Sequence, residues 1–256
     1  MMRDKEANAT HLAYLDAMGI QVWQRRNVSQ SLSQVVTSAP QLQEPVVPEV
    51  VVVPILPPAT ITRPVATVIQ PAVDWPALET QVASCVLCEL HKQRSKPVFG
   101  VGNRTAAWMF IGEAPGVDED QQGEPFVDNA GQLFNLMLKS VGLARQEVYI
   151  TNIVKCRPPG NRDPQAEEFA CCEAYLKQQI ALIKPRIIIA VGRIAAHNLL
   201  KSDQAVGVMR GKQHSYGESN IPVVVTYHPA YLLRSPQEKR KAWEDLLLAR
   251  KIVSAG

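Results

Sequence analysis

Apolar residues follow two different rhythms in the C-terminal two thirds of the chain. Four short apolar runs bounded by glycine or polar residues are typical of buried β-strands. They cover residues 106–112, 147–154, 186–192 and 221–227. Other stretches repeat apolar residues every three or four positions, as one face of a helix does. These helical stretches cover about 130–141, 164–184, 193–200 and 236–253. Strands that alternate with helices predict an α/β fold of three layers, α/β/α, around a central, mainly parallel four-stranded sheet.

The first 73 residues have a different pattern. Residues 10–26 place Leu12, Leu15 and Met18 at helical spacing, so residues 1–26 are predicted to be a short N-terminal segment with helical character. Residues 27–73 are rich in Pro, Val, Ser and Gln, and the frequent prolines exclude a regular helix or sheet. We therefore predict a disordered linker over 27–73 and a folded domain over 74–256, whose first helix is capped by Asp74.

Composition narrows the function classes only slightly. The chain is 46% hydrophobic and 20% charged, with a net charge of +3, which allows a nucleic-acid partner without requiring one. The sequence has no apolar run of 18 residues, and its N-terminus lacks the apolar core of a secretory signal, so we expect no membrane association and a cytoplasmic location. In a reducing compartment the five cysteines favour metal binding over disulfides.

The cysteines occur as a C-x-x-C pair, Cys85 and Cys88, followed by Cys156 and the adjacent Cys171 and Cys172. In the helix predicted over 164–184, Cys172 shares the apolar stripe and Cys171 is turned about 100° away, since a helix has ~3.6 residues per turn. We therefore predict Cys85, Cys88, Cys156 and Cys172 as the metal ligands. Their spacing does not distinguish a structural zinc from a [4Fe-4S] cluster, and four ordinary core cysteines are the alternative.

Polar residues gather where the predicted strands end. The first strand runs into GEAPGVDEDQQGEPF, whose acids are candidates for binding metal, activating water or solvating a loop. Open α/β sheets bind ligands at the carboxyl ends of their strands, so one pocket is predicted to be formed by Glu113, Phe126, Asn152 and His228. Each also has a plain structural interpretation: a helix cap, a core filler, a turn former and a loop histidine. No G-x-G-x-x-G or G-K-S/T loop is present, which argues against dinucleotides and nucleoside triphosphates.

Five motifs in this order resemble the family 4 uracil-DNA glycosylases, the iron–sulfur type of bacteria and archaea. They read VFGVGN, GEAPG, GEPF, TNIVKCRPPGNR and HPAYLLR, and the resemblance extends over about 74–253. It implies a uracil-DNA glycosylase-like fold and a monofunctional hydrolase that releases uracil from DNA and leaves an abasic site for base excision repair. It also implies a structural [4Fe-4S] cluster, rather than zinc, on the four predicted cysteines. We expect this cluster to tie the first helix to the segment after Asn152.

The resemblance implies a role for each residue of the predicted pocket. Phe126 stacks on uracil, Asn152 reads the polar edge of the base, and His228 donates to the developing charge on O2. Glu113 positions or deprotonates the attacking water, so Glu113, Asn152 and His228 are the predicted catalytic residues, and Glu113 is the only loop acid expected to act in the pocket. The predicted substrate-binding residues are Gly112, Ala114, Pro115, Phe126, Asn152 and His228.

DNA contacts are predicted at the rim of this pocket. Phosphate-binding side chains are assigned to Arg157, Arg162, Lys212 and Arg234. Tyr231 or Leu232 is assigned to fill the gap that the flipped base leaves. The sequence departs from the family pattern at Asp128-Asn129, where a turn with glycine is more usual. It also lacks the basic insertion whose histidine forms a covalent adduct in a related branch, so we expect turnover.

Two other functions are compatible with these residues. The first alternative is that the chain is a non-catalytic iron–sulfur DNA-binding module, which keeps the pocket but does not cleave the substrate. The second alternative is that residues 1–73 tether the chain to a protein partner, and this role is compatible with glycosylase activity. We expect uracil-containing DNA as the main partner and a monomeric protein.

Overall fold

The computed structural model of the protein describes residues 74–255. The helix expected over 10–26 and the linker expected over 27–73 lie outside the described residues, and those predictions are not tested. The fold begins where the sequence predicts a first helix, because the Asp74 side chain accepts a hydrogen bond of 3.0 Å from the Ala77 N–H. That helix ends at Ala83, so Cys85 and Cys88 lie in the loop that follows it.

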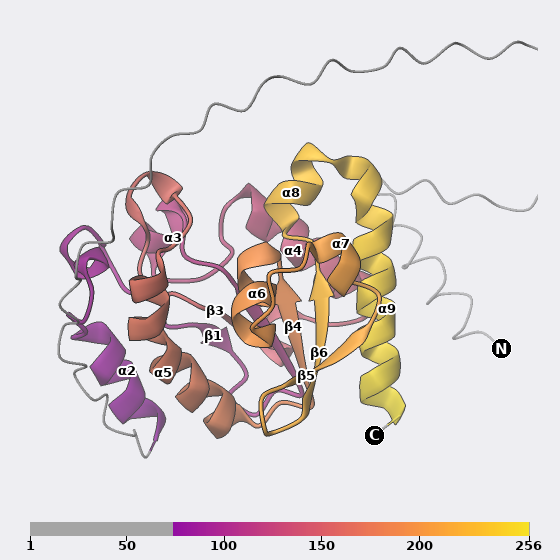
Figure 1. Ribbon diagram of the computed structural model, residues 1–256, viewed down its shortest axis with the longest axis horizontal. Coiled ribbons are helices and arrows are strands. Elements are labelled where there is room, and N and C mark those ends of the chain that lie inside the picture. Colours follow the sequence, from indigo (N-terminus) through magenta and orange to yellow (C-terminus); the bar gives the residue numbers. More distant parts are fainter. Residues whose placement is uncertain (1–73, 256) are drawn as a thin grey trace, which may run out of the picture. The chain divides into compact units, whose positions relative to one another are not determined.

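A six-stranded mixed sheet forms the centre of the fold (Figure 1). Its strands are β1 (Val101–Gly102), β2 (Trp108–Gly112), β3 (Tyr149–Asn152), β4 (Ile187–Val191), β5 (Gln213–Tyr216) and β6 (Ile221–Thr226). In the sheet they are ordered β1-β3-β2-β4-β6-β5, and the four central strands are parallel. The mainly parallel sheet and the α/β class are confirmed. The predicted number of four strands is too small, because β1 and β5 pair as antiparallel edges.

Helices cover both faces of the sheet and give the three predicted layers (Figure 1). The α-helices are α2 (Trp75–Ala83), α3 (Val117–Gln122), α4 (Asn129–Ser140), α5 (Ala166–Ile183), α6 (Arg193–Leu200), α7 (Val206–Met209), α8 (Pro229–Arg234) and α9 (Lys239–Ala255). Short 3₁₀ turns are η1 (Glu89–Lys92), η2 (Arg145–Glu147), η3 (Pro159–Asn161) and η4 (Pro236–Glu238). None of the described helices has the length and apolar character needed to cross a membrane.

Alternate residues of the buried strands supply two separate cores. Phe110, Ile189 and Val224 face a cluster made with α4, α8 and α9. Met109 and Ile188 face the opposite cluster, made with α5 and α6. Strands that are buried on both faces carry continuous apolar runs, which explains why the sequence pattern identifies them.

The order of the strands determines where a ligand binds. From β2 the chain crosses to β3 on one side, and it then returns past β2 to β4 and β6 on the other side. The carboxyl ends of β2 and β4 therefore form a topological switch point, which is the ligand-binding position of open α/β sheets.

Candidate active site

A cavity of about 740 Å³ opens at this switch point. Its walls come from the segments that follow β2, β3, β4 and β6, and from the first residues of α6 and α8. The structure brings together nine of the predicted site residues around this cavity: Glu113, Ala114, Pro115, Phe126, Asn152, Arg162, His228, Tyr231 and Arg234.

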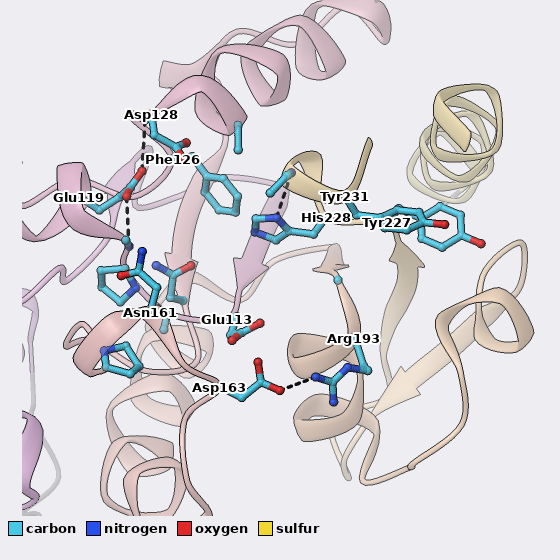
Figure 2. A pocket seen from close by; sticks show the side chains of 18 of the residues that line it. Glu113, Glu119, Phe126, Asp128, Asn161, Asp163, Arg193, Tyr227, His228 and Tyr231 are labelled. Atoms are coloured by element: carbon cyan, nitrogen blue, oxygen red, sulfur yellow. Dashed lines mark hydrogen bonds and ion pairs between the residues drawn. The ribbon is translucent and has the colours of Figure 1, made fainter. Parts of the chain in front are cut away.

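Phe126 forms one wall of the cavity and is held rigidly. Its ring stacks on Phe134 of α4 at a centroid distance of 4.6 Å. On the cavity side it faces the His228 ring, whose centroid lies 5.5 Å away; Figure 2 shows these two side chains next to each other. Its backbone has a φ of 53°, an unfavourable conformation for a residue with a side chain. The Phe126 carbonyl accepts from Arg145 at 3.2 Å, and a Cβ on Gly131 would lie 2.1 Å from the same oxygen. Gly131 therefore permits α4 to approach the Phe126 backbone closely.

Asn152 occupies the last position of β3, beside Gly112 at the end of β2. The Asn152 side chain is buried, and its Oδ1 would lie 2.4 Å from a Cβ on Gly112. The Phe126 ring would lie 2.8 Å from that same Cβ. Gly112 does not line the cavity; it is the residue whose missing side chain leaves room for the Asn152 amide and the Phe126 ring.

His228 follows β6 and caps α8 with its imidazole. Its Nδ1 accepts a hydrogen bond of 3.2 Å from the Ala230 N–H. Burial lowers the pKa of His228 to about 4, so the ring is neutral at physiological pH. A neutral imidazole that accepts at Nδ1 carries its proton on Nε2. His228 is thus a neutral hydrogen-bond donor that lies beside Phe126 in the cavity wall (Figure 2).

Glu113 directs its carboxylate into the cavity beside Asp163, which is ion-paired with Arg193 (Figure 2). Burial, and secondarily the negative charge of Asp163, raise the pKa of Glu113 to about 7, while Arg193 acts in the opposite direction. In the described part of the chain no hydrogen-bond donor reaches this carboxylate. Such a group exchanges a proton near neutral pH, as a general base requires.

A second glutamate of the same loop has a role that the sequence reasoning missed. Glu119 lines the cavity and is buried; its Oε1 accepts from the N–H groups of Val127 at 2.9 Å and Asp128 at 3.2 Å. Its Oε2 accepts from the Gly116 N–H at 3.1 Å. Glu119 thus joins the start of α3 to the segment that follows Phe126. The spacing from Gly116 to Glu119, that of a capping box, is the signal that would have revealed it.

The predicted DNA-contacting residues divide into two groups. Arg162, Tyr231 and Arg234 line the cavity, whereas exposed Lys212 and partly buried Arg157 lie away from its walls. Arg157 instead donates a hydrogen bond of 2.7 Å from its Nε to Asn161 Oδ1. Asn161 lines the cavity, and the sequence reasoning did not select it.

The prediction that Leu232 fills the DNA stack is wrong. Leu232 is only 1% exposed and belongs to the core beside α4 and α9, so it does not reach a nucleic acid. Its neighbour Leu233 is 45% exposed on α8. In a helix as short as α8, adjacent leucines give no periodicity from which the outward one can be identified.

Five cysteine thiols gather between α2, β3 and α5. The thiol of Cys88 interacts electrostatically with those of Cys156, Cys171 and Cys85, and burial raises its pKa to about 11. Cys172 is buried and interacts with Cys156 and Cys88; burial raises its pKa to about 12. Cys171 instead donates to the Leu87 carbonyl at 3.3 Å. The predicted ligands therefore lie near one another, and Cys171 makes a hydrogen bond of its own.

The chemistry of this group suits an anionic iron–sulfur centre. Arg94 donates a hydrogen bond of 3.0 Å from its Nη1 to the Cys156 sulfur. Burial raises the pKa of the Cys156 thiol, so it would stay protonated unless it were bound to metal. Over residues 74–255 no three side chains of His, Cys, Asp or Glu are close enough to hold a single metal ion. Four cysteine thiolates are a donor set that both a [4Fe-4S] cluster and a structural zinc accept.

Comparison with known proteins identifies the class. The family description "Uracil DNA glycosylase superfamily" matches residues 99–247, which include every predicted pocket residue. The chain belongs to the uracil-DNA glycosylase superfamily.

Within that superfamily the chain is similar to type-4 enzymes. It is 44% identical over 171 residues to the type-4 uracil-DNA glycosylase of Archaeoglobus fulgidus, an alignment covering 64% of this chain and 86% of that protein. It is 41% identical over 182 residues to the type-4 uracil-DNA glycosylase of Saccharolobus solfataricus, covering 68% and 84%. The resemblance to family 4 is thereby confirmed.

Proposed function

We propose that the chain is a monofunctional DNA glycosylase that hydrolyses the N-glycosidic bond of uracil in DNA, releasing uracil and leaving an abasic site. One observation supports this most directly. Phe126, Asn152 and a neutral His228 come from three separate segments and meet in one cavity at the switch point. Type-4 relatives carry the name of this activity, which disfavours a binding module without turnover.

Recognition begins with a flipped base, because a uracil inside a duplex is out of reach. Phe126 stacks on the pyrimidine, and its fixed backbone keeps the ring plane constant. The Asn152 amide donates to uracil O4 and accepts from N3–H. The edge of cytosine leaves both groups unpaired, and a buried polar group without a partner costs about 1–3 kcal/mol.

Bond cleavage places negative charge on uracil and positive charge on the sugar. The Nε2–H of neutral His228 donates to O2, where negative charge grows, so this interaction is stronger in the transition state than in the ground state. The Glu113 carboxylate orients a water molecule toward C1′ and accepts its proton. Its pKa of about 7 suits that transfer at neutral pH.

The phosphate backbone is held at the cavity rim. We assign this role to Arg162 and Arg234, with Arg157 and Lys212 contributing from farther away, and we assign Tyr231 and exposed Leu233 to the gap in the base stack. Arg162 is already paired with Glu168 at 2.6 Å, so it enters DNA binding as an oriented group.

We further propose that Cys85, Cys88, Cys156 and Cys172 hold a structural [4Fe-4S] cluster. Bound there, the cluster supplies a cross-link between the loop after α2, the segment after β3, and α5. Metal analysis of the purified protein tests this: about four iron atoms per chain are expected, and stoichiometric zinc would contradict it. A partner for residues 1–73, a monomeric state and a cytoplasmic location stay predictions.

A labelled oligonucleotide with one deoxyuridine tests the activity. Incubation with the protein followed by alkali is expected to break the strand at that position and not at cytosine or thymine. Asn152→Ala and His228→Ala are expected to lower kcat/KM about 10²–10³-fold each, the usual effect of removing one preorganised donor. Lys251→Ala serves as the control, because it removes an exposed charge on α9 that does not line the cavity. Intact strands from iron-loaded protein would refute the proposal.

A further inference from the structure

Arg145 contacts the backbone of Phe126 without lining the cavity, and the proposed chemistry leaves it without a role. It is the first residue of η2. Its Nη1 donates to the Phe126 carbonyl at 3.2 Å and to Asn135 Oδ1 of α4 at 3.3 Å, and its Nη2 donates to the Pro125 carbonyl. One guanidinium thus holds two consecutive carbonyls of the segment that carries the stacking ring.

The peptide group between Phe126 and Val127 is held at both of its polar atoms. Arg145 holds the carbonyl oxygen, and Glu119 accepts from the Val127 N–H at 2.9 Å. A cation and an anion from two distant elements therefore grip one peptide group. That group cannot rotate without breaking a charge-assisted hydrogen bond, which is stronger than one between neutral groups.

The backbone of Phe126 needs this restraint because its φ is 53°. A residue with a Cβ disfavours the left-handed region, so it stays there only where the surrounding contacts impose that conformation. Over residues 74–255 neither the Pro125 nor the Phe126 carbonyl accepts from another protein group. A change of φ would carry the side chain with it and alter the plane of the ring. An arginine stays charged at any pH compatible with folding, so the restraint does not depend on pH.

We propose that Arg145 is a positioning residue that fixes the plane in which Phe126 stacks on uracil, an inference that rests on the proposed function. The guanidinium holds the backbone, whereas the ring forms the cavity wall, so Arg145 acts on the base only through Phe126. It therefore strengthens binding of the base and leaves binding of the DNA backbone at the rim unaffected.

The test compares Arg145→Met with Arg104→Met in the full chain. Methionine keeps an unbranched apolar side chain and removes every donor. Arg104 also links a loop to a helix, because it pairs with Glu79 of α2 and lies over the Trp75 ring at 5.1 Å, and it is not part of the cavity wall. Both variants remove an arginine that joins two parts of the fold, and only one of them releases Phe126.

Free uracil and an oligonucleotide with a tetrahydrofuran abasic site separate the two kinds of binding. The Ki of uracil as an inhibitor reports the base pocket, and the Kd of the abasic oligonucleotide reports the rim. For Arg145→Met we expect Ki to rise about 10-fold, part of the effect of losing a base–aromatic stack, with Kd within about twofold of wild type. Arg104→Met is expected to change neither value. An unchanged Ki in Arg145→Met, or an equal rise of Ki and Kd, would overturn the proposal.

A milder variant keeps the proposal testable if Arg145→Met does not fold. Asn135→Ala removes the acceptor that orients Nη1 and leaves both carbonyl contacts in place. It is expected to raise the Ki of uracil several-fold without changing Kd, and an unchanged Ki would contradict the proposal.

A readout that needs no turnover separates this inference from the proposed function. If wild-type protein releases no uracil from a deoxyuridine oligonucleotide, the proposed function fails. The NMR resonances of the His228 ring, whose centroid lies 5.5 Å from that of Phe126, then report the position of the Phe126 ring. They are expected to shift in Arg145→Met and to stay in place in Arg104→Met. Unshifted resonances in Arg145→Met would show that Arg145 does not position Phe126.

Discussion

Glu113 and Glu119 lie six residues apart in the segment after β2, Glu113 in the loop and Glu119 in α3, and both line the cavity. Glu119 accepts hydrogen bonds from three backbone N–H groups and ties together two parts of the loop. Glu113 has no such donor, and burial beside Asp163 raises its pKa to about 7. The same side chain is thus a fixed structural acceptor in one place and, in the proposed mechanism, a proton acceptor in the other. The difference teaches that backbone donors, and not residue type or proximity to the site, decide which acid is free to react.

Glu113→Gln should have the largest effect on activity. The amide keeps the shape and cannot accept a proton, so kcat is expected to fall about 10²–10⁴-fold in the deoxyuridine assay. Folding stability should respond in the opposite direction. The raised pKa means that the charged carboxylate disfavours the folded state, fully so above pH 7, so thermal unfolding at pH 8 should shift upward in the variant. An unchanged kcat would show that Glu113 does not accept a proton during the reaction.

Glu119→Ala should instead have a large effect on stability and a small effect on activity. Three backbone N–H groups lose their acceptor, and the unfolding free energy is expected to fall by about 1–3 kcal/mol in a denaturant titration. Because the segment after Phe126 loosens, kcat/KM should fall only about 10-fold. Asp118→Ala, an exposed acid of the same helix, is the matched control for the change of charge. A kinetic loss as large as that of Glu113→Gln, with stability intact, would make Glu119 a second catalytic acid.

The dependence of kcat on pH should show the smallest of the three effects. Glu113 must be ionised to accept a proton, so kcat is expected to rise as pH increases through about 7 and to be about 10-fold below its plateau at pH 6. His228, whose pKa burial lowers to about 4, stays neutral across this range and adds no second limb. The rise should vanish in Glu113→Gln and persist in Glu119→Ala. A rise that persists in Glu113→Gln would point to another titrating group.

The sequence predicts the centre of the fold better than its edges. β4 is found because Ile187–Val191 is buried on both faces and reads as a continuous apolar run. β1 has two residues, one of them glycine, and β5 is partly exposed with the sequence QHSY, so neither has an apolar signal. These edges are specified by pairing with β3 and β6, which acts over long sequence separations.

The same distinction applies to the site. The strand-end positions of Asn152 and His228 follow from topology, and the burial of Cys172 follows from helical phase. The role of Glu119 depends on where backbone N–H groups elsewhere in the fold point. Lys155 is of a residue type usually found on the surface, although the fold buries it. Such roles arise from tertiary contacts that no local pattern encodes.

The crowding of Gly112, Asn152 and Phe126 has a consequence for how this pocket changes over time. A single methyl group on Gly112 would lie within 2.8 Å of both neighbours, and Gly131 fixes the backbone of Phe126 from behind. A side chain at Gly112 or at Gly131 therefore requires its neighbours to move. Gly207 on α7 also lines the cavity, and a Cβ there would meet the Tyr227 hydroxyl at 3.6 Å, an ordinary contact distance. A cavity for a larger base would therefore require coordinated changes at this wall.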